Sequence, residues 1–223
     1  MIDLNRTLSF PFREPDWFPK FLIGALFMIL SLFGLGIPVI AGYLVQTTQR
    51  VMRREHTVLP EWTDVGVMFV VGFKWCVVYV VYLLPVFVAM LPFLFLTMLG
   101  VFLEDNGALD LLATASLLVI LSLFLIPYSI LVTLLLPIVT LEFAKRERIS
   151  DALNVGNVLR IFRAHWRDAL VIALIGVAVS ALAALGFLLF LVGILFTTFY
   201  AYLVMAHLAG QLYHADTQGE ARS

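Results

Sequence analysis

The stretch of the chain from position 169 to position 206 contains 38 residues and not one charged side chain. As a single helix it would be roughly 57 Å long, whereas the hydrocarbon core of a bilayer is about 30 Å thick. We therefore expect this stretch to cross a membrane twice, as a hairpin that turns near residues 186–193.

The rest of the chain has the same character. Three more uncharged blocks precede that stretch, at residues 21–49, 75–103 and 111–141. Charged residues make up 13% of the chain, whereas soluble domains carry about 25%, and this excludes a soluble enzyme with one anchor. We predict an all-α integral membrane protein, with a single polytopic membrane domain over residues 1–213 and a flexible polar tail over 214–223.

The first uncharged block leaves two alternatives open. Its centre reads Gly34-Leu35-Gly36-Ile37-Pro38, which is typical of a turn. Either the block is a re-entrant or tilted hairpin with arms that are short for full crossings, or it is one kinked crossing. The hairpin would keep the N-terminus on the side of Arg50, and the single crossing would not. The total is five to six membrane helices, some of them re-entrant, plus interfacial amphipathic helices.

The distribution of charge predicts the orientation. The connection between the second and third blocks holds Glu104, Asp105 and Asp110 and no basic residue. The connections on either side of it, after the first block and over 142–168, are rich in arginine and lysine. Basic connections prefer the cytoplasm. We therefore expect a cell-membrane protein with cytoplasmic basic loops, a cytoplasmic C-terminus and an external acidic loop 104–110.

Tryptophans and arginines predict a layer of structure along the cytoplasmic membrane surface. With Ser150 as N-cap, residues 151–167 wind into a helix with one apolar face and arginines along its edge. Such a helix either lies on anionic headgroups or packs on the end of the bundle, and the two are not exclusive. The candidate residues for contact with lipid headgroups are Trp17, Arg53, Trp62, Lys74, Arg160, Arg163, Trp166 and Arg167.

Small residues recur every fourth position at Gly176, Ser180 and Ala184. This spacing lets membrane helices approach closely, so these residues are candidates for helix packing, either within the chain or with a partner subunit. The single cysteine, Cys76, excludes an intrachain disulfide.

The sequence carries no recognisable catalytic constellation. It has no nucleophile–base pair, zinc spacing, Walker loop or dinucleotide fingerprint, so we expect no catalytic residues, no cofactor and no metal. His207 and His214 share a helix face and cannot bind one haem iron from both sides. His207 is interpreted as a polar contact inside the bundle, and His214 as solvated.

Several short sequence motifs are informative when their order along the chain is considered together. They are FPFREPDW at 10–17, Gly24, Gly42-Tyr43, LPEW at 59–62, GFK at 72–74, Ala201-Tyr202 and HLAGQLY at 207–213. Over about residues 5–213 this order resembles a family of prokaryotic membrane proteins catalogued as domain of unknown function 4013. The resemblance implies a polytopic membrane domain and no catalytic residues. The polar motifs are expected to form the shared layer on the cytoplasmic side, in which carboxylates pair with basic residues.

These observations favour a non-enzymatic membrane protein, either an accessory subunit or a scaffold that contacts lipid. The alternative is a small transporter or channel for a lipid or apolar solute, which the proline-containing helices and the hairpins would suit. The expected partners are membrane lipids, with a larger membrane complex or self-association as further alternatives, and no nucleic acid.

Overall fold

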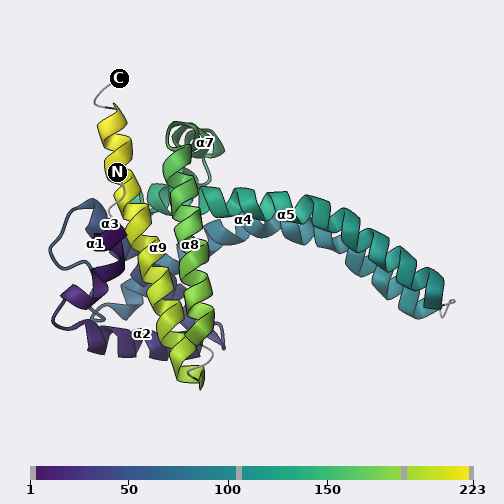
Figure 1. The fold of residues 1–223 in the computed structure, drawn as a ribbon, viewed down its shortest axis with the longest axis horizontal. Helices are drawn as coiled ribbons and strands as arrows, with labels where there is room; N and C mark the ends of the chain where they lie inside the picture. The colour runs from purple at the N-terminus through teal and green to yellow at the C-terminus, as the bar shows by residue number, and fades with distance from the viewer. Residues whose placement is uncertain (1–3, 104–106, 187–189, 221–223) are drawn as a thin grey trace. The chain divides into compact units, whose positions relative to one another are not determined.

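The computed structural model describes residues 4–103, 107–186 and 190–220 (Figure 1). The chain divides into two compact units, one formed by Met1–Val78 with Leu134–Ser223 and the other by Tyr79–Thr133. Helices account for the regular structure of the described residues, which confirms the all-α prediction. Their bounds are α1 (Leu4–Ser9), the 3-10 helix η1 (Pro11–Arg13), α2 (Trp17–Ser31), α3 (Gly36–Met52), α4 (Val65–Leu103), α5 (Gly107–Arg146), α6 (Ile149–Ala152), α7 (Val155–Ala164), α8 (Trp166–Leu185) and α9 (Phe190–Glu220).

Four helices in this part of the chain are long and apolar enough to cross a membrane. Helix α2 is apolar but shorter, and α3 is of similar length. The prediction of five to six membrane helices therefore holds in its coarser form, as a multi-pass helical protein. The four candidate spans are Val65–Met98, Leu118–Arg146, Trp166–Ala184 and Gly193–Thr217.

The first uncharged block forms a helical hairpin rather than one kinked helix. Helix α2 ends at Ser31, and a short turn leads into α3, which packs against α2. Gly34 in the turn has φ +81°, a conformation that costs other residues energy but not glycine. The final uncharged block is a hairpin as well, because α8 and α9 lie side by side (Figure 1). Residues 187–189 of its turn lie outside the described residues.

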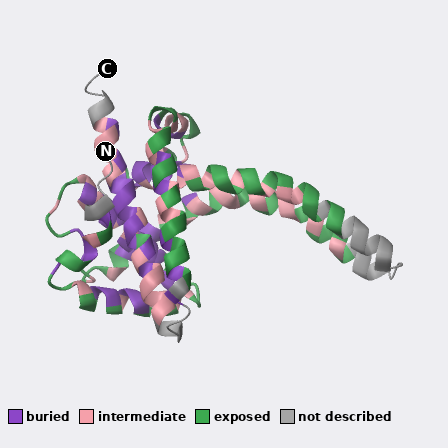
Figure 2. Cartoon of the chain, viewed as in Figure 1, coloured by how far each residue is buried: buried purple, intermediate pink, exposed green. Residues whose placement is uncertain are grey.

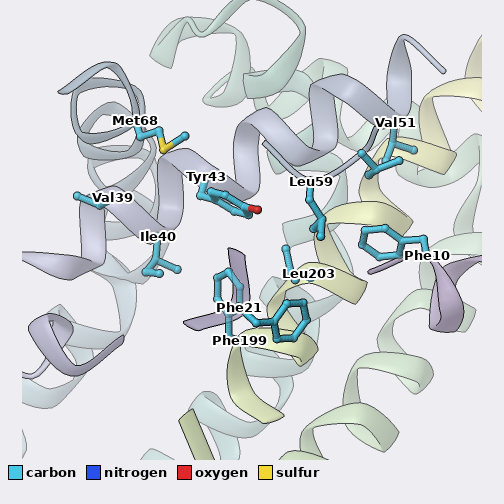
Figure 3. Close-up of a cluster of buried hydrophobic side chains, with 11 residues drawn as sticks. Phe10, Phe21, Val39, Ile40, Tyr43, Val51, Leu59, Met68, Phe199 and Leu203 are labelled. Atoms are coloured by element: carbon cyan, nitrogen blue, oxygen red, sulfur yellow. The ribbon is translucent and has the colours of Figure 1, made fainter. Parts of the chain in front are cut away.

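Helix α9 is the centre of the larger unit. It contacts α1, α2, α3 and α8, and much of its length is buried (Figure 2). Figure 3 shows side chains from α2, α3 and α9 converging in the apolar core, among them Phe21, Tyr43, Phe199 and Leu203, each no more than 3% exposed. Burial of side chains of this size stabilises a fold by about 1.5–3 kcal/mol each.

Glycines permit the closest helix crossings of this unit. A Cβ atom on Gly24 would lie 2.5 Å from the ring of Phe199, and one on Gly210 would lie 2.6 Å from Cβ of Val51. Real Cβ atoms do not approach so closely, so α2 and α3 reach α9 only because these positions lack a side chain. Both glycines belong to the short sequence motifs on which the family resemblance rests.

The smaller unit consists of α4 from Tyr79 onward and of α5 up to Thr133. Pro85 and Pro92 lie inside α4 without ending it. The hydroxyl of Tyr128 donates to the backbone oxygen of Tyr82 at 2.6 Å and ties the two helices together. The acidic residues Glu104 and Asp105 of the predicted external loop lie outside the described residues. Most of the large apolar side chains of this unit are exposed (Figure 2), as expected of helices that face lipid.

The predicted amphipathic helix over 151–167 is wrong in its bounds. The chain forms α6, breaks at Leu153 and Asn154, and starts α7 at Val155. The side chain of Asn154 accepts a hydrogen bond from the Asn157 amide, so Asn154 and not Ser150 is the N-cap of α7. At the other end of the chain, α9 continues through the predicted tail to Glu220, and Asp216 within it is 4% exposed.

Candidate functional site

A buried ion pair ties the N-terminal segment to the connection between α3 and α4. One oxygen of Glu14, Oε2, lies 3.0 Å from Nζ of Lys20. The other, Oε1, accepts from the backbone amides of Val58 and Leu59 at 2.6 and 2.7 Å. The two charged side chains are 8% and 10% exposed. Buried charges are tolerated when they are paired and hydrogen-bonded in this way.

The carbonyl of Leu59 receives two cationic side chains from separate helices. Nζ of Lys20 in α2 donates to it at 3.0 Å, and Nη1 of Arg50 in α3 donates to it at 3.1 Å. Charge-assisted hydrogen bonds are about twice as strong as neutral ones. The ends of α2 and α3 that carry these cations are therefore held together at one point.

Next to this point the ring of Trp62 is stacked inside the protein. Its centroid lies 4.2 Å from that of Tyr43 and 5.2 Å from that of Phe27. Its Nε1 donates to the backbone oxygen of Lys20 at 3.0 Å. Trp62, predicted as a headgroup contact, is thus a half-buried link between α2, α3 and the connection that follows α3.

Tyr43 is fully buried beneath Trp62. Among the described residues its hydroxyl has no hydrogen-bond partner. Its ring stacks on Trp62 and packs on Phe199, so Tyr43 contributes to the core of this region.

A third polar group links α1 to α9. Oγ1 of Thr7 and Nδ1 of His207 lie 3.2 Å apart, and Nε2 of Gln211 donates to Oγ1 of Thr7 at 3.0 Å. The ring of Phe10 stacks on His207 at 4.4 Å. The prediction that His207 is a polar contact inside the bundle is confirmed. His214 is half-buried and bonds to the backbone oxygen of Val51 at 3.2 Å, so its assignment as solvated is wrong.

A second buried ionic cluster joins α5, α7 and α9. Lys145 pairs with Glu142 of its own helix and lies 3.6 Å from Oδ2 of Asp216 in α9. Nδ2 of Asn157 donates to the other oxygen of Glu142 at 2.7 Å. His165, between α7 and α8, lies 3.9 Å from Oδ1 of Asp216. These contacts fix the basic connection to the end of the bundle.

The remaining predicted headgroup residues fall into two groups. Trp17 packs on Phe12 and Phe21 and is half-buried, as is Lys74. Arg53, Arg160, Arg163, Trp166 and Arg167 are exposed. Of these, the last four lie on α7 and the first residues of α8, and the guanidinium of Arg167 sits over the Trp166 ring at 5.4 Å.

Helix α7 divides its apolar residues between the protein and the surface. Val158 and Ile161 are at most 1% exposed, so this part of the helix packs on the bundle. Val155 is 56% exposed, and Leu159 and Phe162 are half-buried. The helix thus carries more apolar surface than the bundle covers.

The predicted packing residues of α8 are only partly in contact with the chain. A Cβ on Gly176 would lie 3.0 Å from the sulfur of Met205 in α9, so Gly176 does face a neighbouring helix. Ser180 and Ala184 are exposed. The residues of α8 that pack inward are instead Ala169, Ile172, Val179 and Ala183.

Comparison with known protein families decides the classification. A family model described as "Protein of unknown function (DUF4013)" matches residues 23–196. The chain belongs to this family. The matched region contains Gly24, Gly42, the LPEW motif and Gly72. It is shorter than the resemblance seen in the sequence motifs, which extended over about residues 5–213. No curated protein and no solved structure matches the chain.

Membership in DUF4013 assigns no role to any residue. The structure nevertheless explains why motifs outside the matched residues 23–196 occur together with those inside it. Glu14, before the matched region, binds the amides of Val58 and Leu59 within it. Gly210, after the matched region, packs on Val51 within it. Sequence analysis did not single out the Glu14–Lys20 pair or the Glu142–Asp216 cluster as sites. In the sequence these residues are recognisable only as charged residues beside apolar runs. A solvated surface residue shows the same pattern.

Proposed function

We propose that this protein is a non-enzymatic multi-pass membrane protein, an accessory subunit or scaffold, that holds anionic lipid headgroups against α7 and the start of α8. The observation that carries the proposal is the exposed apolar edge of α7 beside a row of exposed arginines. This combination is the signature of helices that lie in the headgroup region.

The geometry of α7 supports contact with a membrane surface. At about 100° per residue, Val155, Leu159 and Phe162 fall within an arc of about 60°. Arg163 and Arg160 follow about 40° and 100° beyond Leu159. Acyl chains would cover the first group, and lipid phosphates would reach the second. Each basic residue near an anionic surface contributes about 1 kcal/mol.

The buried polar groups support a non-enzymatic role. Glu14, Lys20 and His207 each bond to a neighbouring helix or connection, and so do Glu142 and Asp216. A catalytic acid, base or nucleophile has to present to its substrate a polar atom that is not fully occupied by hydrogen bonds within the protein. Here the polar atoms act as links between helices, which is the use expected in a scaffold.

The proposal includes a topology. The hairpin α2–α3 and the four candidate spans make up six membrane helices. The basic connections and the C-terminus lie in the cytoplasm, and the acidic segment 104–110, whose residues from Gly107 onward belong to α5, lies outside. The excess of arginine and lysine in the basic connections supports this orientation.

The test is mass spectrometry of everything that stays bound after extraction from the native membrane in polymer discs. We expect the wild type to retain anionic phospholipid and the triple variant R160Q/R163Q/R167Q to lose most of it. The matched control R13Q/R146Q/R148Q removes the same charge from other exposed positions and should retain the lipid. Equal loss in both variants would reject the α7 site.

The same spectra test the accessory role. A stoichiometric protein partner supports an accessory subunit, and a self-associated chain supports a scaffold. A lone chain that carries a small molecule rejects both and favours the transporter alternative.

A further inference from the structure

The hairpin α2–α3 is too short to cross a membrane twice. Helix α2 has 15 residues and α3 has 17, so they are about 23 and 26 Å long. A bilayer core is about 30 Å thick. Nevertheless, residues 21–49 contain no charged side chain. A hairpin of this kind either lies within the protein or enters the bilayer only in part.

The charged ends of the two helices are at the same place. Lys20, at the start of α2, and Arg50, near the end of α3, donate to one carbonyl oxygen, that of Leu59. The opposite end of the hairpin, its tip, is formed by the turn between Ser31 and Gly36. The hairpin therefore has a charged base and an uncharged tip.

The tip exposes large apolar side chains. Leu32 is 75% exposed, Phe33 79% and Leu35 64%. The outer face of α2 continues this surface through Phe18, Leu22, Leu26 and Ile29, each at least 42% exposed. These positions are three or four residues apart and so form one stripe of the helix. A contiguous apolar surface of this kind marks a contact with lipid or with another protein.

Three consecutive amides of the tip are paired within the chain. The amides of Leu32, Phe33 and Gly34 donate to the carbonyls of Ile29, Leu30 and Ser31 at 3.0–3.1 Å. The hydroxyl of Ser31 donates to the carbonyl of Phe27 at 2.8 Å. A turn inside a bilayer must pair its polar groups internally. The absence of charge over residues 21–49 and the internally paired amides of Leu32, Phe33 and Gly34 together favour acyl chains, which offer no polar partner, over a protein surface.

We infer that α2–α3 is a re-entrant hairpin that dips into the bilayer and returns, with lipid acyl chains against its tip and the outer stripe of α2. The N-terminal segment and the connection after α3 then lie on the same side of the membrane. The inference rests on the multi-pass topology of the proposed function but not on the arginines of α7.

Single-cysteine labelling tests the inference in sealed membrane vesicles that contain the full chain. In a Cys76→Ala background, Arg13→Cys and Arg53→Cys mark the two sides of the base, and Phe33→Cys marks the tip. We expect a charged, impermeant maleimide to label both base positions from the same side of the vesicle. The tip should be protected from either side and become reactive only after solubilisation in detergent. A spin label at position 33 should be relaxed more by oxygen than by a water-soluble nickel chelate.

Labelling of Arg13→Cys and Arg53→Cys from opposite sides would overturn the inference, and so would labelling of the tip without detergent. Leu35→Cys provides a second tip position if Phe33→Cys does not fold. Loss of lipid retention on substitution of the α7 arginines is measured separately. The two results therefore identify which of the two proposals fails.

Discussion

Gly72 of α4 lies directly against Gly42 of α3. A Cβ on Gly72 would lie 1.7 Å from the carbonyl oxygen of Pro38 and 2.4 Å from the amide nitrogen of Gly42. A Cβ on Gly42 would lie 1.8 Å from the carbonyl oxygen of Met68. The two helices cross with backbone against backbone, and this contact joins the hairpin α2–α3 to the first candidate span.

We expect Gly72→Ala to destabilise the protein by at least about 3 kcal/mol, because the atoms in the way belong to the backbone and cannot rotate aside. Thermal unfolding in mild detergent measures the effect. Gly66→Ala, near the start of the same helix with open space around its Cβ position, is the matched control and should leave the melting temperature unchanged or raise it slightly. Similar melting temperatures for the two variants would contradict the crossing.

Substitution of Glu14 by glutamine should cost about 3 kcal/mol, because it leaves the buried Lys20 ammonium with only the exposed carboxylate of Glu61 at 3.9 Å as a counter-charge. Denaturant titration of the purified protein measures the loss. The double variant Glu14→Gln/Lys20→Met should be more stable than the sum of the single effects predicts. Arg53→Gln breaks an ion pair with Glu55 in which the arginine is 71% exposed, and it should cost less than about 1 kcal/mol. An additive double variant would contradict the pairing.

Tyr43→Phe removes a buried hydroxyl that lacks a partner, so we expect a gain of about 1 kcal/mol at pH 8. Melting curves of the two proteins in the same mild detergent measure the difference. A variant that melts at a clearly lower temperature than the wild type would contradict a buried hydroxyl without a partner.

Asn154→Ala should weaken α7 by about 1 kcal/mol, because the amide of Asn157 loses the side-chain acceptor that caps the helix. Hydrogen exchange of the amides over Val155–Ala164 reports this local stability. Ser150→Ala is the control, since the Ser150 hydroxyl bonds to Asp151 rather than to a helix amide, and it should leave exchange in α7 unchanged. Faster exchange in the Ser150 variant would restore the N-cap that the sequence indicated.

The helical class and the second hairpin could be predicted from the sequence, because an uncharged run of 38 residues is far longer than a bilayer core is thick. The first hairpin was one of two alternatives, because residues 21–49 are no longer than the block 75–103, which lies within the single helix α4. The choice between Ser150 and Asn154 as N-cap could not be predicted, since both residue types cap equally well. The choice depends on where the chain bends between α6 and α7, which is a tertiary property.

The candidate site was less accessible to sequence reasoning than the fold. Glu14 accepts hydrogen bonds from the backbone amides of Val58 and Leu59. Because almost every residue has a backbone amide, the sequence does not indicate which amides Glu14 binds. Trp62 lies in the connection that begins with the basic residues Arg50, Arg53 and Arg54, and it fits a headgroup anchor by that position. Its ring, however, stacks on Tyr43 and Phe27, and an aromatic ring suits a protein core as well as a membrane interface.

The central position of α9 has a consequence for biosynthesis. Its residues Phe199 and Leu203 complete a core whose other members come from the beginning of the chain, and Thr7 reaches His207 across 200 positions. At ribosomal speeds of about 5–20 residues per second, roughly 10–40 s separate the synthesis of these two partners. During that interval α2 and α3 can pack on each other and on α4, but they lack α9, which completes their core. The newly made hairpin therefore has to wait, exposed to lipid or to the insertion machinery, until the helix that encloses it emerges.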